Sequence, residues 1–200
     1  MEKKINVLSI DCDYALSVEG VTKVVNFFLK HIEEVDLKKI IFSQIHANIY
    51  YTLDPLLQVG NQIDILSIDH HHDVLGAKVG ISSQSFESSN WLGYYLSQPG
   101  FIQNAYWLCN YDSNKECSVN RYDDVLTVLY DFEDIEINKF DHIFVCISPV
   151  TANLLSHSLF NVLIEIVKRS KKCEKIDFYR KNILNHFSQQ ISPLSGNNVK

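Results

Sequence analysis

The sequence contains no Cys-x-x-Cys pair, no basic stripe and no apolar run long enough to span a bilayer. Its five cysteines are odd in number and widely spaced, so we expect neither a disulfide framework nor a cysteine-type zinc site. The net charge of −6 disfavours nucleic acid as a bulk partner. The opening MEKKINVLSID enters a strand-like segment without the apolar core of a signal peptide, so we expect a cytoplasmic protein with no membrane contact.

There is also no internal repeat and no domain linker in the 200 residues. A chain of this length suits one domain with a sizeable core. The hydrophobic fraction of 46% and the charged fraction of 21% are those of a soluble globular protein. We therefore expect one domain over residues 1–187 and a flexible polar tail over residues 188–200.

Short apolar segments of strand character alternate with amphipathic segments of helical spacing, and a long polar loop is expected at 110–124. This alternation predicts a single-domain, three-layer α/β/α fold with a mainly parallel sheet. Strands are expected at residues 5–10, 39–43, 62–68, 105–109, 125–130 and 142–148. Helices are expected at residues 18–34, 47–59 (broken or kinked at Pro55), 88–97 and 151–169, the last capped by Thr151.

Titratable side chains gather where three of the predicted strands end, in the segments SIDCDYAL, FSQIHAN and IDHHHDV. In parallel sheets, ligands bind outside the carboxyl ends of the strands. Alternate residues of an extended segment point the same way, so Cys12, His70 and His72 are expected to face away from the others. The candidate metal ligands are then Asp11, Asp13, His46, Asp69, His71 and Asp73.

Four carboxylates packed together repel one another strongly unless cations lie between them. Two divalent ions held by bridging carboxylates would relieve that repulsion. A site rich in oxygen with few imidazoles favours Mn²⁺ over zinc, without settling the metal's identity. Taken singly, an Asp-x-Asp pair is a weak signal, and His46 alone is more often a satisfied polar residue than a ligand. The three motifs together, each at a strand exit, favour a two-metal site over these structural interpretations.

The motifs resemble those of the ureohydrolase superfamily of arginases and agmatinases, in which SxDxD, DxHxD and an isolated histidine supply the metal ligands. Their order here, with Asp-x-Asp first, is similar to a smaller branch that includes the peptide arginases. These enzymes convert arginine side chains of ribosomally made peptides to ornithine. The segments HANIYYTLDPLL, SSNWLGYYLSQPGFIQNAYWLCN and IFVCISPVTANLL are also similar to that branch, so the resemblance covers residues 5–155.

The resemblance implies an arginase/deacetylase-like fold and two bound Mn²⁺ ions. It also implies that water activated by the two ions attacks the guanidinium carbon, so that urea and an amine are formed. Asp13 and Asp69 are the expected catalytic residues, with Asp13 as a proton shuttle. As ligands, Asp11 and Asp69 would bridge the metals, His46 and Asp73 would complete one site, and His71 and Asp13 would complete the other.

The substrate expected from the resemblance is an arginine-containing peptide or a small guanidino compound. The branch often has an acidic residue two places after the first histidine and another after the Ser-Pro, where this chain has Asn48 and Val150. We expect Asn48 and Asn90 to contact the substrate. A helix N-cap is an equally good interpretation of Asn90.

Two other functions compete with this one. A DHH-type phosphoesterase also binds two Mn²⁺ ions, and SIDCDYALS and IDHH are similar to its motifs. That class needs an aspartate at the intervening strand end, where this chain has His46, and a second domain for which 200 residues leave little room. The other alternative is an arginase-like protein that has lost its substrate-binding carboxylate and acts only in binding.

Overall fold

The computed structural model describes residues 3–74, 86–98, 100–110, 113 and 126–170. The tail predicted at 188–200 and most of the loop predicted at 110–124 lie outside the described residues. Across the described parts of the chain, no helix is long and apolar enough to cross a membrane.

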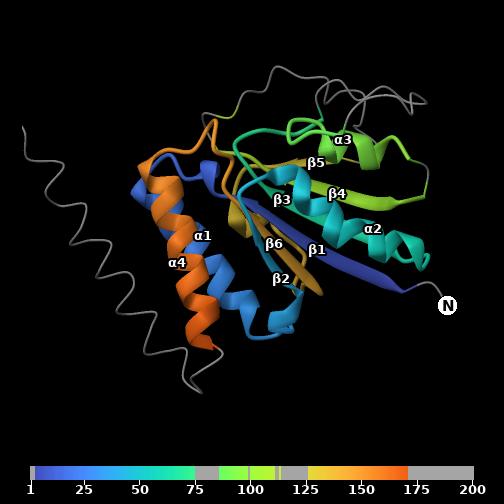
Figure 1. Ribbon diagram of the computed structural model, residues 1–200, viewed down its shortest axis with the longest axis horizontal. Coiled ribbons are helices and arrows are strands. Elements are labelled where there is room, and N and C mark those ends of the chain that lie inside the picture. The colour runs from blue at the N-terminus through green and yellow to red at the C-terminus, as the bar shows by residue number, and fades with distance from the viewer. Residues whose placement is uncertain (1–2, 75–85, 99, 111–112, 114–125, 171–200) are drawn as a thin grey trace, which may run out of the picture.

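Six parallel strands form one sheet in the order β2-β6-β1-β3-β4-β5 (Figure 1). The predicted α/β fold with a parallel sheet is therefore confirmed. The central strands consist of nearly continuous apolar residues because both of their faces are buried. The strands are β1 (Lys4–Asp11), β2 (Ile40–Ser43), β3 (Gln62–Ile68), β4 (Ile102–Leu108), β5 (Leu126–Leu129) and β6 (His142–Cys146).

Helices pack on both faces of the sheet (Figure 1). Leu8 and Ile10 of β1 lie in an apolar cluster with α1 (Val18–Ile32) and α4 (Leu154–Ser170). Ile5 and Val7 lie in a second cluster, with α2 (Tyr50–Gln58) and α3 (Trp91–Leu96). Because side chains alternate along a strand, β1 supplies both clusters. The arginase/deacetylase-like character of this arrangement stays a prediction.

The chain reverses direction across the sheet next to β1. From β1 it passes through α1 to β2 on one side, and α2 then brings it back to β3 on the other side. Such a switch point opens a crevice at the carboxyl ends of the strands, where ligands bind. Asp11, the last residue of β1, pairs in register with Cys146, the last residue of β6, so these two ends lie level.

Three helices begin three residues later than predicted. The short turn η3 (His46–Ile49) precedes α2, which continues through Pro55. Pro55 and Tyr51 are both exposed, so water can bind the carbonyl group that lacks a helical donor. α3 begins at Trp91 rather than at residue 88, and α4 begins at Leu154 rather than at Thr151.

Thr151 does not cap α4, contrary to the sequence prediction. The carboxamide of Asn153 does so, because its Oδ1 accepts hydrogen bonds from the backbone N–H groups of Leu155 at 2.7 Å and Ser156 at 3.0 Å. The hydroxyl of Thr151 is used elsewhere, at the carboxyl edge of the sheet.

Candidate metal centre

The first pair of predicted ligands comes from a tight turn at the end of β1. Asp11 ends the strand, and Asp13 lies in the 3-10 turn η1 (Cys12–Tyr14). Oδ1 of Asp11 accepts a hydrogen bond from the backbone N–H of Asp13 at 3.2 Å and so caps the turn. The two carboxylates converge because of this turn, and not because of strand alternation as the sequence argument assumed. Cys12 packs into the apolar cluster beneath α1 and α4, as expected.

The segment after β3 also leaves the extended conformation. Oδ1 of Asp69 accepts from the backbone N–H of His71 at 2.8 Å, and Asp73 lies in the left-handed region with a φ of 51°. Asp is one of the few residue types that tolerate this region. These local bonds turn the chain so that Asp69, His71 and Asp73 all face the carboxylates at the end of β1.

The other two histidines of this segment have different neighbours. Nδ1 of His70 lies 3.3 Å from Oδ1 of Asn110. The ring of His72 lies edge-on to Trp107, and its Nδ1 accepts from the backbone N–H of Val74 at 3.0 Å. Both therefore flank the centre without entering the carboxylate cluster.

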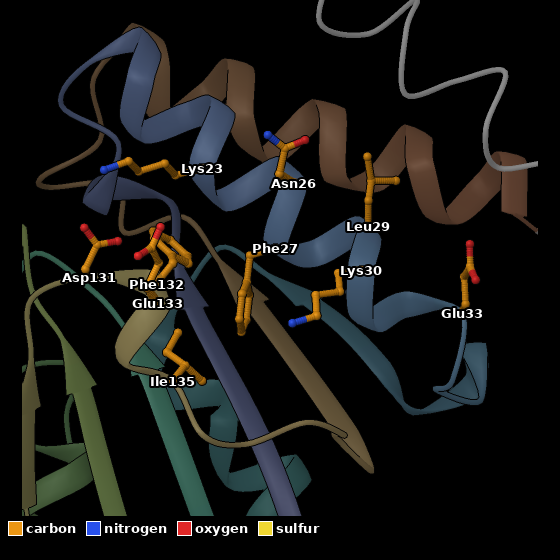
Figure 2. Close-up of a pocket in the computed structure, with 10 residues that line it drawn as sticks. All are labelled: Lys23, Asn26, Phe27, Leu29, Lys30, Glu33, Asp131, Phe132, Glu133 and Ile135. Carbon is orange, nitrogen blue, oxygen red and sulfur yellow. The ribbon is translucent and has the colours of Figure 1, made fainter.

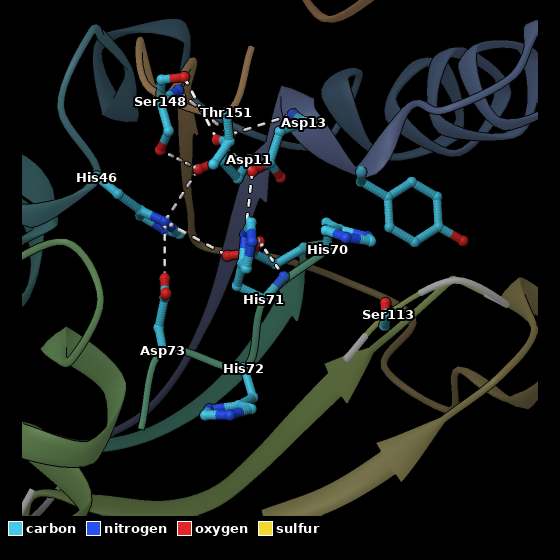
Figure 3. A network of polar contacts seen from close by, with 12 residues as sticks. Asp11, Asp13, His46, His70, His71, His72, Asp73, Ser113, Ser148 and Thr151 are labelled. Atoms are coloured by element: carbon cyan, nitrogen blue, oxygen red, sulfur yellow. Dashed lines mark hydrogen bonds and ion pairs between the residues drawn. The ribbon is translucent and has the colours of Figure 1, made fainter. Parts of the chain in front are cut away.

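His46 is buried at the middle of the first group of ligands (Figure 3). Its Nδ1 lies 2.9 Å from Asp73 Oδ2, 3.3 Å from Asp11 Oδ2 and 3.4 Å from Asp69 Oδ2. Its other ring nitrogen, Nε2, lies 2.9 Å from the hydroxyl of Ser9. When Nε2 donates to Ser9, the lone pair of Nδ1 faces three carboxylates, so a proton or a metal ion must lie between them.

His71 belongs to a second group, which is more exposed. Its Nδ1 lies 3.1 Å from Asp13 Oδ2 and 3.9 Å from Asp69 Oδ1, and 43% of its side chain is accessible. One ligand atom from each of Asp13, Asp69 and His71 lies within 4.8 Å of the others, and the same is true of His46, Asp69 and Asp73. Asp69 is thus common to both groups.

The charges of the cluster shift the pKa values of its members. Burial, reinforced by Asp73, Asp13 and Asp11, raises the pKa of Asp69 well above its usual range. Burial lowers the pKa of His46, but Asp73 and Asp11 outweigh it and bring the pKa well above the ordinary value. The hydrogen bond to Asp13 raises the pKa of His71. The cluster without metal therefore retains protons that a divalent cation would displace.

Two buried oxygens in the centre show that the residues fit a cation. Oδ1 of Asp13 and Oδ2 of Asp69 are fully buried, and within the described chain neither has a hydrogen-bond partner. Buried polar atoms without a partner are rare and costly. Carboxylate oxygens that face two imidazole nitrogens form the donor set of a divalent metal, so this cluster can hold a metal ion.

Three polar side chains that the sequence argument did not assign hold the ligands in place. The hydroxyl of Ser148 donates to Asp11 Oδ2 at 2.5 Å, and the hydroxyl of Thr151 donates to Asp13 Oδ2 at 2.6 Å (Figure 3). The indole of Trp91 donates to Asp73 Oδ2 at 2.6 Å. One feature of the sequence could have identified Ser148 and Thr151: they follow the last strand directly, at the edge of the sheet where the predicted ligands lie.

The two predicted substrate contacts have other hydrogen-bond partners. The carboxamide of Asn48 donates to the hydroxyl of Ser43 at 2.9 Å. Oδ1 of Asn90 accepts from the backbone N–H of Glu87 at 2.9 Å, and Asn90 makes no side-chain bond to the first turn of α3. Both residues shape loops beside the centre, and their contact with a substrate stays a prediction without support from these bonds.

A cavity of about 400 Å³ opens over the ligands. Ile45, Pro149 and Val150 form an apolar part of its wall, and the residues Ile45 and Val150 are 51% and 96% exposed. Asp11, Asp73 and Glu87 supply the acidic part. Among the described residues that line this cavity there is no Lys or Arg, so its charge suits a cationic ligand.

A larger cavity of about 630 Å³ lies between α1 and the turn η5 (Phe132–Asp134) (Figure 2). It shares no lining residue with the cavity over the ligands. Its described lining carries both signs of charge, with Lys23 and Lys30 beside Glu33, Asp131 and Glu133, so the cavity does not select a ligand by charge.

All six predicted ligands, from Asp11 to Asp73, therefore lie in one cluster at the carboxyl edge of the sheet, and all except His71 are buried. That they bind metal, and in which roles, stays a prediction. Comparison of the chain with family models, with curated proteins and with solved structures finds no match in any of the three. Its function has to be argued from the geometry of this centre.

Proposed function

We propose that this protein is a binuclear Mn²⁺-dependent hydrolase that converts arginine residues of a ribosomally made peptide to ornithine, with release of urea. One observation carries the proposal. Two groups of ligands share Asp69, and His71 and Asp73 from these groups line a cavity whose described wall is acidic and has no Lys or Arg. The two groups support two metal ions, and the excess of carboxylates over imidazoles supports Mn²⁺.

The reaction consumes one water: the C–N bond between the guanidinium carbon and the side-chain nitrogen breaks, that nitrogen leaves as an amine, and the carbon leaves as urea. When bound, the divalent ions supply a water of lowered pKa close to the carboxylates. Asp13 would hold a proton during transfer, and this role is supported by its Oδ1, which has no hydrogen-bond partner among the described residues, and by its Oδ2, which contacts His71 and Thr151. Asp69, buried beneath both groups, would hold the two ions together.

Charge complementarity supports a guanidinium group as the substrate. If four carboxylates neutralise two divalent ions, Glu87 remains as the acidic side chain on the described wall of the cavity. Two hydrogen bonds hold the loop that carries Glu87: Asn90 accepts from the backbone N–H of Glu87, and the hydroxyl of Ser88 accepts from the backbone N–H of Ala47 at 3.2 Å. Glu87 would thus take the place of the acidic residues expected at positions 48 and 150, where this chain has Asn48 and Val150.

The open apolar rim supports a peptide rather than a free amino acid. Val150 and Ile45 are large, exposed and adjacent to the cavity, so a segment that flanks the target arginine can cover them. A free amino acid would leave this rim in contact with water.

The test is to incubate the Mn²⁺-loaded protein with arginine and with arginine-containing peptides, and to measure urea and peptide mass. We expect urea release and a peptide mass lowered by the elements CH₂N₂, with less turnover of free arginine. The Asp69→Asn variant is the matched control and should release no urea. Release of phosphate from phosphodiesters would instead favour the phosphoesterase alternative, and bound metal with no hydrolysis of any guanidino compound would favour a binding protein.

A further inference from the structure

Cys146 lies at the candidate metal centre although it belongs to no recognised motif. It ends β6, pairs in register with Asp11, and is completely buried. Its Sγ, one carboxylate oxygen of Asp11 and one ring nitrogen of His46 all lie within 4.8 Å of one another. These three groups come from β6, β1 and η3, so the fold alone brings them together.

A second observation points to a ligand at the same imidazole, that of His46. Oδ2 of Asp69 is buried without a hydrogen-bond partner among the described residues, and it lies 3.4 Å from Nδ1 of His46. Because Nε2 of His46 lies 2.9 Å from the hydroxyl of Ser9, Nδ1 is the nitrogen left to bind a cation. The unpartnered oxygen of Asp69 and the thiol of Cys146 are thus both neighbours of the same imidazole, that of His46.

The other described cysteines do not share this position. Cys12 packs in the apolar cluster beneath α1 and α4. The thiol of Cys109 donates to the backbone carbonyl of Leu129 at 3.5 Å. Cys146 instead lies on the sheet face that carries the His46 ring, which stacks against Phe144 and contacts Trp91.

We infer that Cys146 is a thiolate ligand of the metal ion held by His46, and that this position prefers a softer divalent ion such as Zn²⁺ or Co²⁺ to Mn²⁺. Thiolate donors favour these softer ions, whereas the group of Asp13, Asp69 and His71 offers only oxygen and nitrogen. When the sulfur–metal bond forms, the S–H bond breaks and the proton leaves to solvent, as coordination of a thiol requires. The two positions would therefore differ in the ion that they hold.

This inference depends on the proposed metal centre and replaces Mn²⁺ at one of its two positions, but it does not depend on a guanidino substrate. The test is a Co²⁺ titration of the metal-free full-length chain, followed by near-ultraviolet absorption, in the wild type, Cys146→Ser and Cys109→Ser. We expect a sulfur-to-cobalt charge-transfer band in the wild type and in Cys109→Ser, and no band in Cys146→Ser. In a competition experiment, the ratio of Zn²⁺ affinity to Mn²⁺ affinity should be at least about tenfold lower in Cys146→Ser than in the wild type.

Binding of Co²⁺ to the wild type without a charge-transfer band would overturn the inference and leave the metal centre itself intact. No binding of any divalent ion to the wild type would overturn both. If Cys146→Ser fails to fold, X-ray absorption of the Zn²⁺-loaded wild type shows whether a sulfur atom binds the metal. Scattering from a sulfur atom bound to zinc supports the thiolate, and scattering from nitrogen and oxygen alone overturns it.

Discussion

At the scale of single residues, Asp69 has the largest predicted effect because its carboxylate belongs to both groups of ligands. Asp69→Asn keeps an oxygen that can accept from the backbone N–H of His71 but removes one of four clustered charges. Without metal, and at a pH above the raised pKa of Asp69, we expect the variant to be at least as stable as the wild type, because it lacks the buried charge that Asp11, Asp13 and Asp73 repel.

With saturating Mn²⁺, we expect Asp69→Asn to be less stable than the wild type. An ion at a hundred times its dissociation constant stabilises the folded wild type by about 2.7 kcal/mol per site. Asp69→Asn should lose this increment at both sites. Thermal unfolding with and without Mn²⁺, together with elemental analysis, measures it, and Asp36→Asn on the short turn before β2 is a suitable control. Full metal occupancy in Asp69→Asn would show that the assignment of the site is wrong.

Glu87 should determine how strongly the cavity prefers a positively charged substrate. The change Glu87→Gln keeps the size of the side chain and the backbone bond to Asn90 but removes the negative charge from the cavity wall. We expect KM for an arginine peptide to rise about fivefold, since an exposed ion pair contributes up to about 1 kcal/mol, while kcat changes little. Steady-state kinetics beside Glu34→Gln, an exposed residue outside the cavity, would measure this. An unchanged KM would exclude Glu87 from substrate binding.

At the scale of elements, the connection from β6 to α4 holds the ligands at the end of β1. Within it, Ser148 donates to Asp11 and Thr151 donates to Asp13. Thr151→Val keeps the shape of the side chain and removes this donor. We expect Mn²⁺ affinity to fall about tenfold or more, as is usual when a group that orients a metal ligand is lost.

Isothermal titration with Mn²⁺ would measure that loss. The matched control is Thr127→Val, which makes the same change at an exposed position of β5 and should leave the affinity unaltered. Equal affinities for the two variants would mean that Thr151 does not orient Asp13.

The elements also differ in how well local sequence predicted them. The strands were predicted to within a few residues, because a buried strand is a continuous apolar run between polar turns, as in Gln62–Ile68. The start of α4 was predicted three residues too early, because Thr151 has a good capping side chain but Asp13 binds it. The competing partner lies 138 positions away in the chain, so no local pattern reveals it.

At the scale of the whole molecule, the metal-free centre should make the free energy of unfolding fall as the pH rises. Bound metal should remove or reverse this fall. Without metal, the carboxylates raise the pKa of His46 and His71 above their unfolded values, so the folded state binds more protons than the unfolded state. That stabilisation is complete below about pH 6.5 and is lost as pH rises through the folded pKa values. Asp69, whose pKa is also raised, acts in the same direction.

We therefore expect the free energy of unfolding in EDTA to fall as the pH rises above about 6.5. Saturating Mn²⁺ should remove or reverse this fall, because metal binds the deprotonated ligands. Denaturant unfolding at several pH values, in EDTA and in Mn²⁺, measures both curves. Parallel curves would contradict a metal site built from these histidines. Asp11, whose pKa is lowered mainly by His46 against the effect of burial, contributes only in the acidic range.

The sequence by itself determined the α/β fold and the six candidate ligands, because apolar periodicity and strand-end polar residues are local properties of the chain. It could not show why Asp11 and Asp13 converge, since that depends on a 3-10 turn rather than on strand alternation. Only the tertiary structure placed β6 between β2 and β1. That strand order brings Cys146, Ser148 and Thr151 to the ligands. The order results from the packing of segments that are distant in sequence, so no local pattern in the chain reveals it.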